Sequence, residues 1–499
     1  MAMPPRNVLV IVCDQLRPDF LSAYGGSGVP TPNIDRLASM GVTFTRAITQ
    51  STVCGPARAT MMTGRFVSDH RVWTNNIPFR EGLEYLPERM NALGYRTGCA
   101  GKLHHAPARD TKGFAFAWLM EESRLGPDDD YFQFLKTRHP EVERIFNYDP
   151  ERLVFDFDDE DHYEHWIASE SIRFLDSTPG GEPFFLWTSF QGPHTPLDPP
   201  RSVKGTCRAE DLPALIVDDE PTVPVHRTRR AVFNETVYTD ATGEGPGNGA
   251  IREAYAESIV FIDRQVGRLL EALESSGRLD NTTILFTSDH GDLLGDHGQI
   301  TKGPFVWRGN LDIPLIVANH PALAPGARSD ALVGNIDVPG TALDIAGDER
   351  GIGHARSLLT MVDDDAPARR EVIFSEHADL VKIVDTDRWR FAYYPFTGAR
   401  ELFDRASDPD ELTNLSRRPE AASVEAELLA HVVDFMCLAK GLELPAYDFG
   451  PEQQRGVTKK HPNWKRRRDI PSAFPLTEAM KARLRAVGVE DDYDEWVEG

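Results

Sequence analysis

Four short apolar runs along the chain are each followed at once by polar residues and by glycine or proline. The first run, residues 8–12, is continuously apolar and rich in β-branched side chains, and it stops at Cys13 and Asp14. A continuous apolar run predicts a parallel strand covered on both faces. Three later runs follow the same pattern and span residues 95–100, 184–189 and 282–287. Since ligands of open α/β sheets bind beyond the carboxyl ends of strands, we expect the four loops after these runs to converge.

Two helices are predicted from residues between and beside these strands. Thr31 precedes Pro32, and Gly41 follows a short amphipathic stretch, which is typical of a helix with an N-cap, a proline in its first turn and a glycine stop. Residues 250–277 carry apolar side chains at the three- and four-residue spacing of a long amphipathic helix, at Ile259, Ile262, Val266, Leu269, Leu270 and Leu273.

The pattern changes near residue 370. Residues 372–374, 380–384 and 388–393 are short alternating segments separated by polar turns, which predicts a small antiparallel sheet. The chain is therefore divided into an α/β domain, a smaller α+β subdomain and an extended tail, which span residues 1–368, 369–440 and 441–499.

Three polar segments interrupt this organisation. Residues 211–249 are rich in proline, glycine and charge, which predicts a long excursion over the surface. Residues 459–468 form a basic run in the tail, which favours a solvated or subunit-contacting arm. The acidic run at residues 156–161 is open to two interpretations, a second metal site or an exposed charged stretch, and the charged stretch is favoured.

Composition and charge narrow the class of protein. The chain has 499 residues with 54 basic and 78 acidic side chains, a formal net charge of −24. This acidic excess argues against non-specific binding to nucleic acid or to an anionic membrane. No apolar run approaches the roughly 20 residues of a membrane span, so we expect a cytoplasmic protein. The cysteines are few and irregularly spaced, which favours reduced thiols, at positions Cys13, Cys54, Cys99, Cys207 and Cys437.

The most specific motif is Cys54-Gly55-Pro56-Ala57-Arg58, followed by Thr63-Gly64. It resembles the signature of the sulfatase family, Cys-x-Pro-x-Arg followed by a short helix and Thr-Gly. A five-residue pattern alone arises by chance fairly often, but ordered companions extend the resemblance over most of the chain. These companions are residues 7–15, 32–37, 101–104, 193–194, 289–291, 401–404, 408–409 and 414–415.

The resemblance implies a fold and a nucleophile. The implied fold is α/β and alkaline-phosphatase-like, with a mixed, mostly parallel sheet sandwiched by helices and a smaller C-terminal antiparallel-sheet subdomain. In that family the cysteine matching Cys54 is oxidised to formylglycine, so the resemblance implies a formylglycine-generating enzyme as a maturation partner. One hydroxyl of the hydrated aldehyde attacks sulfur or phosphorus, and the second then expels the bound oxyanion, which divides one difficult displacement into two steps.

The resemblance also implies one divalent metal ion. Its implied ligands are Asp14, Gln15, formylglycine 54, Asp289 and His290. Many sulfatases carry a second aspartate where this chain has Gln15 and an asparagine where it has His290, and the pairing seen here resembles the phosphonate monoester hydrolase branch. Imidazole shifts metal preference from calcium toward manganese, so both ions stay open.

Further site residues follow from the resemblance. Arg58 is expected to stabilise the formylglycine loop, and Lys102 and His104 to flank the nucleophile. His194 with Lys302 is expected to contact the substrate oxyanion and to assist departure of the leaving group. Asn75 is expected to donate a hydrogen bond to the substrate, as the matching asparagine does in phosphonate monoester hydrolases, although turn formation explains this residue about as well.

Four functions are therefore compared for a small anionic ester substrate. The leading hypothesis is hydrolysis of sulfate monoesters of an aryl type, and its closest rival is a phosphonate monoester hydrolase or phosphodiesterase that uses the same residues. A two-metal phosphatase or phosphomutase would need serine or threonine at Cys54, and a non-catalytic binding protein would not need the complete residue set. The polar and aromatic tail after Gly441 favours a homo-oligomer, either a dimer or a tetramer.

Overall fold

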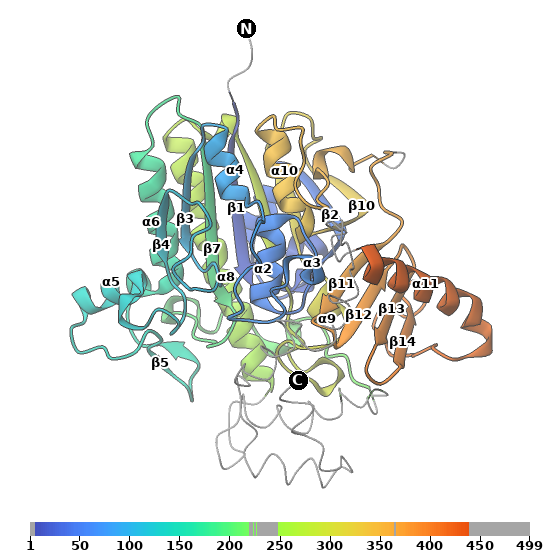
Figure 1. Ribbon diagram of the computed structural model, residues 1–499. Coiled ribbons are helices and arrows are strands. Elements are labelled where there is room, and N and C mark those ends of the chain that lie inside the picture. The colour runs from blue at the N-terminus through green and yellow to red at the C-terminus, as the bar shows by residue number, and fades with distance from the viewer. Residues whose placement is uncertain (1–4, 219–222, 224–225, 227–247, 364–365, 439–499) are drawn as a thin grey trace, which may run out of the picture.

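A large eight-stranded sheet forms the centre of the protein (Figure 1). The computed structural model describes residues 5–218, 223, 226, 248–363 and 366–438. The strands, in their order across the sheet, are β10 (Ala327–Gly334), β2 (Gly41–Ile48), β9 (Leu315–Ala318), β8 (Thr282–Ser288), β1 (Asn7–Asp14), β7 (Phe184–Pro193), β3 (Arg96–Gly101) and β4 (Phe116–Leu119). Only β9 runs antiparallel to its neighbours β8 and β2. The sheet is therefore mixed and mostly parallel, as predicted.

Strand β1 shows why the sequences of the central strands are continuous apolar runs. Its alternate residues Leu9 and Ile11 belong to one buried cluster, whereas Val8, Val10 and Val12 belong to another on the opposite face. The first cluster includes apolar residues of α1 (Pro32–Ser39), α6 (Tyr163–Ser177) and α8 (Asn248–Ser275). The second includes those of α2 (Cys54–Thr63), α4 (Leu86–Ala92) and α10 (Val338–Ile345). Both faces of β1 are therefore buried by helices.

Helix α1 begins where the sequence predicts, but its first turn is capped by a different residue. Thr31 occupies the N-cap position without a side-chain cap. The carboxylate of Asp263, on α8, instead accepts hydrogen bonds from the backbone N–H groups of Asn33 and Ile34, at 3.0 and 2.8 Å. One helix thus satisfies the first donors of another, which ties α1 to the long crossover helix.

A second, four-stranded antiparallel sheet lies beside the large one (Figure 1). Its strands are β11 (Ile373–His377), β12 (Val381–Asp385), β13 (Trp389–Tyr394) and β14 (Ala399–Asp404). The first three strands match the predicted segments, and β14 was not predicted. One face packs on α11 (Ala422–Leu438), through side chains such as Phe391 and Leu428. The other face packs on Trp307 and Leu311 of the large domain. The domain boundary at residues 368 and 369 stays a prediction.

Shorter elements complete the described chain. They are α3 (Val67–His70), α5 (Asp130–Arg138), α9 (Arg308–Leu311), β5 (Tyr148–Asp149) and β6 (Val154–Phe155), together with short 3-10 turns. All five cysteines are free, which agrees with the prediction of reduced thiols. None of the helices in the described part of the chain is long and apolar enough to cross a membrane.

The predicted surface excursion at residues 211–249 is only partly described. Val223 and His226 are fully or almost fully buried, so these two residues do not follow the expected surface path. His226 lies against the ring of Trp307 and hydrogen-bonds to Tyr394. Most of residues 219–247, and the tail with its basic run at 459–468, lie outside the described residues.

Candidate functional site

The carboxyl edge of the large sheet gathers the polar loops, as the order of motifs along the chain predicts. Strands β1 and β8 are parallel neighbours, and Cys13 is paired with Ser288. The next residue on each chain segment, Asp14 and Asp289, therefore lies at the same end of the strand pair. Strand β3 ends just before Lys102, whose backbone N–H bonds to the carbonyl of Ser189 in β7. Segments distant in sequence therefore meet at one edge.

Helix α2 presents Cys54 to this edge. Cys54 is the first residue of the helix, and the preceding Val53 has no side chain that can cap it. The side-chain oxygen of Asn75 takes that role by accepting the N–H of Gly55 at 2.8 Å. Asn75 therefore caps helix α2 in this structure, while its predicted contact with substrate stays a prediction.

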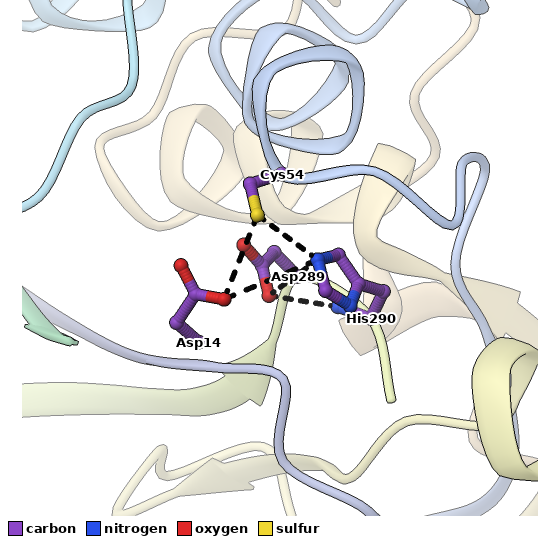
Figure 2. Close-up of side chains that lie close together, drawn as sticks. All are labelled: Asp14, Cys54, Asp289 and His290. Atoms are coloured by element: carbon purple, nitrogen blue, oxygen red, sulfur yellow. Dashed lines mark hydrogen bonds and ion pairs between the residues drawn. The ribbon is translucent and has the colours of Figure 1, made fainter. Parts of the chain in front are cut away.

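Four buried side chains converge at Cys54 (Figure 2). They are Asp14, Cys54, Asp289 and His290, and their potential ligand atoms all lie within 4.8 Å of one another. The sulfur of Cys54 is 3.1 Å from Nε2 of His290 and 3.6 Å from Oδ1 of Asp14. No second group of this kind occurs in the part of the chain that the structure describes. In the acidic run at 156–161, Asp161 instead pairs with Arg138 and His139.

The chemistry of this group fits a divalent cation. Nδ1 of His290 lies 2.9 Å from the carbonyl oxygen of Gly291, which identifies Nδ1 as the protonated nitrogen and directs the Nε2 lone pair toward Cys54. Burial lowers the pKa of His290, so the ring is neutral, as a metal ligand must be. Two carboxylates and one imidazole form a mixed oxygen and nitrogen donor set.

Gln15 lies beside this group and has a left-handed backbone with φ of 70°. Its backbone N–H donates to Oδ1 of Asp289 at 3.0 Å, and its side-chain amide donates to Asp292. Its side-chain oxygen accepts a hydrogen bond from Nζ of Lys302 at 2.7 Å. Gln15 thus connects Lys302 to the metal-capable group, and its assignment as a ligand stays a prediction.

Arg58 holds the two carboxylates of the group in place. Its Nε donates to Oδ2 of Asp289 at 2.9 Å and its Nη2 to Oδ2 of Asp14 at 3.2 Å, while Nη1 donates to Ser189 and to the carbonyl of Lys102. Burial acts to lower the pKa of Arg58, but Asp289 and Asp14 outweigh it and raise the pKa. A guanidinium suits this position because its planar fork can serve two carboxylates at once.

Lys102 is fully buried between two carboxylates. Its Nζ lies 2.7 Å from Oδ2 of Asp14 and 2.5 Å from Oε1 of Glu122. Burial would raise the pKa of Asp14, but the cations of Lys102, His194 and Arg58 hold it well below its usual range. Nδ1 of His194 lies 3.9 Å from the same oxygen of Glu122. Sequence reasoning missed Glu122, because no motif surrounds it.

His104 lies next to this network, with its backbone fixed by a second acid that the sequence did not indicate. Glu121 accepts the backbone N–H groups of Leu103 and His104, at 2.7 and 3.1 Å. Burial, followed by the positive charges of Lys102 and Arg124, lowers the pKa of His104 well below its usual value. The ring of His104 is therefore neutral at physiological pH.

Comparison with known proteins adds independent information. A family model described as Sulfatase matches residues 6–348, and one described as N-sulphoglucosamine sulphohydrolase, C-terminal, matches residues 295–436. An arylsulfatase of Clostridium perfringens is 29% identical over 455 residues, which cover 83% of this chain and 91% of that protein. A sulfatase of Formosa agariphila is 30% identical over 438 residues, with 82% of each chain covered. Among solved structures, the phosphonate monoester hydrolase of Agrobacterium radiobacter superposes with a TM-score of 0.74 at 25% identity, over 87% of this chain and 96% of that chain.

Proposed function

The chain belongs to the sulfatase family, and from this premise we propose that it hydrolyses sulfate monoesters, aryl esters among them, at the group formed by Asp14, Cys54, Asp289 and His290. The reaction takes one ester and one water and yields an alcohol and hydrogensulfate. The observation that carries the proposal is the position of Cys54, whose sulfur at the start of α2 lies 3.1 Å from His290 and 3.6 Å from Asp14.

The family implies a metal ion and a formylglycine, and the buried donors fit both. Asp14, Asp289 and His290 would hold the ion beside residue 54. When bound, a divalent ion neutralises negative charge on the transferred group and lowers the pKa of a coordinated hydroxyl. Oxidation of Cys54 would replace the thiol by an aldehyde whose hydrate carries two hydroxyls. We favour manganese over calcium because of the imidazole.

The remaining residues have roles that follow from their contacts. Arg58 is almost fully buried and positions Asp14 and Asp289 through its hydrogen bonds. Lys102 and Lys302 supply positive charge near Asp14, where the nonbridging oxygens of a sulfate group need it. His194 is the proposed acid for the leaving oxygen, and the neutral ring of His104 is the proposed hydrogen-bond partner of the nucleophile.

A second function is favoured by a specific observation. The phosphonate monoester hydrolase of Agrobacterium radiobacter shares the fold over most of both chains, and Gln15 with His290 resembles the pairing of that branch. Sulfate monoesters and phosphonate monoesters each carry one negative charge, so one site can stabilise both transition states. The second candidate is therefore hydrolysis of phosphonate monoesters or phosphodiesters by the same residues.

One set of measurements tests both candidates. Mass spectrometry of the peptide that contains Cys54 should show an aldehyde fraction in active preparations, and Cys54→Ala should lower kcat for an aryl sulfate by about 10⁴-fold or more. Cys437→Ala, which changes an exposed cysteine, is the matched control and should retain full activity. Wild-type activity in Cys54→Ala would refute the mechanism. A higher kcat/KM for an aryl phosphonate monoester than for the aryl sulfate would establish the second candidate.

Three properties of the intact protein complete the proposal. We propose maturation by a formylglycine-generating enzyme, assembly into a dimer or tetramer and a cytoplasmic location. Light scattering of the full chain and of a chain ending at residue 440 would test whether the tail at 441–499 mediates assembly. Cell fractionation would test the location.

A further inference from the structure

Glu122 is an acidic residue in a site that has to bind an anion. It follows β4 in the chain, and its Oε1 is shared by three groups: Nζ of Lys102 at 2.5 Å, the side-chain amide of Gln191 at 3.0 Å and Nδ1 of His194 at 3.9 Å. Two of these partners, the Lys102 ammonium and the His194 imidazole, are groups that the proposed function assigns to the substrate. Glu122 therefore contacts the groups that would bind the transferred oxyanion.

The position of Glu122 in the network differs from that of Asp14. Both carboxylates contact the same ammonium, but Asp14 is fully buried whereas the Glu122 side chain is 22% exposed. The contacts therefore lead from the buried metal-capable group toward solvent, from Asp14 through Lys102 to Glu122.

Lys102 has a second carboxylate beside it in addition to Glu122. Asp14 already lies 2.7 Å from its Nζ, so the carboxylate of Glu122 cancels positive charge that would otherwise attract substrate. Glu122 also has a left-handed backbone, with φ of 58°, which is unfavourable for a residue with a long side chain. Burial acts against ionisation, but Lys102 and His194 lower the pKa of Glu122 to about 2, so the charge is present at neutral pH.

The electrostatic repulsion between a fixed negative charge and an anionic ligand increases with the charge of the ligand. Sulfate monoesters, phosphonate monoesters and phosphodiesters carry one negative charge, whereas a phosphate monoester carries close to two at neutral pH because its second pKa is about 6. At the same distance, a dianion is therefore repelled by Glu122 about twice as strongly as a monoanion. Such a difference is large enough to separate the two classes of ester.

We propose that Glu122 is a specificity-determining residue that disfavours dianionic esters relative to monoanionic esters at this site. The inference rests on the proposed function, since it takes Lys102 and His194 as groups that face the substrate. It names the substrate class that the site excludes, phosphate monoesters, and it requires no contact between Glu122 and the alcohol portion of the substrate.

Binding of two inert ligands of different charge tests the proposal. Calorimetry on manganese-loaded protein would measure Kd for benzenesulfonate, a monoanion, and for phenylphosphonate, a dianion at pH 8.5. Glu122→Gln should tighten phenylphosphonate by about tenfold more than benzenesulfonate. Glu122→Asp keeps the charge and should retain most of the wild-type ratio. Glu427→Gln, which removes an exposed carboxylate on α11, is the matched control for net charge and should leave the ratio unchanged.

The outcomes are separable. A ratio that changes by less than twofold in Glu122→Gln, and also in Glu122→Asn, whose side chain tolerates the left-handed backbone, would overturn the proposal. A change of twofold or more in favour of phenylphosphonate over benzenesulfonate, in either variant, supports it. Because the readout is affinity, it can be read even if the wild-type protein hydrolyses no sulfate ester, an outcome that would refute the proposed function alone.

Discussion

The protein contains two buried networks of arginines and carboxylates. They differ in whether their side-chain atoms are directed only at one another or also at a reactive side chain. At the junction of the small sheet with the large domain, Arg390 is fully buried and donates from its three nitrogens to Asp385, Glu411 and Asp312, at 2.7, 2.8 and 2.6 Å. Arg405 contacts the same three carboxylates. Each carboxylate there is thus shared by two guanidinium groups.

The network at the carboxyl edge is less evenly balanced. Arg58 also serves two carboxylates, Asp14 and Asp289, but its remaining nitrogen donates to neutral oxygens. Oδ1 of Asp14 and Nε2 of His290 are directed at Cys54 instead. The comparison indicates that a network in which two guanidinium groups share every carboxylate stabilises a junction, whereas one that directs ligand atoms at a common point can hold a metal ion.

The same substitution in both networks gives the largest expected contrast. Arg58→Lys keeps the charge but loses the planar fork, so kcat/KM for an aryl sulfate should fall by about 100-fold. Arg390→Lys should lower the melting temperature by several degrees, through loss of roughly 2–4 kcal/mol of hydrogen bonding, with kcat per folded molecule within threefold of wild type. Steady-state kinetics and calorimetric melting would measure both. A loss of rate in Arg390→Lys without a loss of stability would contradict the comparison.

Metal removal should affect only one of the two networks. A chelator should abolish hydrolysis, and manganese should restore it while stabilising the folded protein by about 2.7 kcal/mol at 100 times Kd. Arg390→Lys should show the same rise in melting temperature on metal addition as wild type. His290→Ala should show little or none, because it lacks one of the proposed ligands. An unchanged rise in His290→Ala would remove that residue from the metal site.

The smallest expected effect is a pH dependence of folding stability, which arises in the segment that packs on α2. Burial lowers the pKa of His70, on α3, from 6.5 to about 3, and its Nε2 lies 3.1 Å from Oγ1 of Thr60 in α2. Below pH 6.5 the unfolded chain binds a proton that the folded chain refuses, so acid lowers stability by about 1.4 kcal/mol per pH unit until the folded pKa is reached.

Melting temperatures of wild type and His70→Gln at pH 7.5 and pH 5.0 would test this effect. The stability advantage of wild type should be larger at pH 7.5 and should shrink at pH 5.0. An advantage that stays constant or grows on acidification would show that His70 is protonated in the folded protein.

The fold was predictable where burial leaves a simple pattern. Strand β1 is buried on both faces and therefore reads as an unbroken apolar run. Strand β2 was missed because it contains the exposed Thr45 and the partly exposed Arg46 and begins at the glycine that ends the preceding helix region. The cap of α1 could not be predicted, because Asp263 lies more than 200 residues away in the chain.

The site was predictable where the chemistry needs a rare ordered motif. Asp14 ends β1, Cys54 begins α2, and Asp289 and His290 follow β8, and the four side chains converge. Glu122 carries no such signal, because its contacts depend on a left-handed backbone and on partners from two other segments, Lys102 after β3 and Gln191 with His194 at the end of β7. Asn75 was predicted as a substrate contact, and the structure gives it a helix-capping contact that a turn motif does not reveal.

The complete burial of Cys54 has a consequence for how the protein is made. Because this residue has no exposed surface and all ten residues of α2 are buried, the proposed maturation enzyme would have to reach the sulfur before the chain has folded. The proposed oxidation to the aldehyde would therefore compete with folding in time. A chain that folds first would enclose an unmodified thiol, and such molecules would have to unfold before they could be converted.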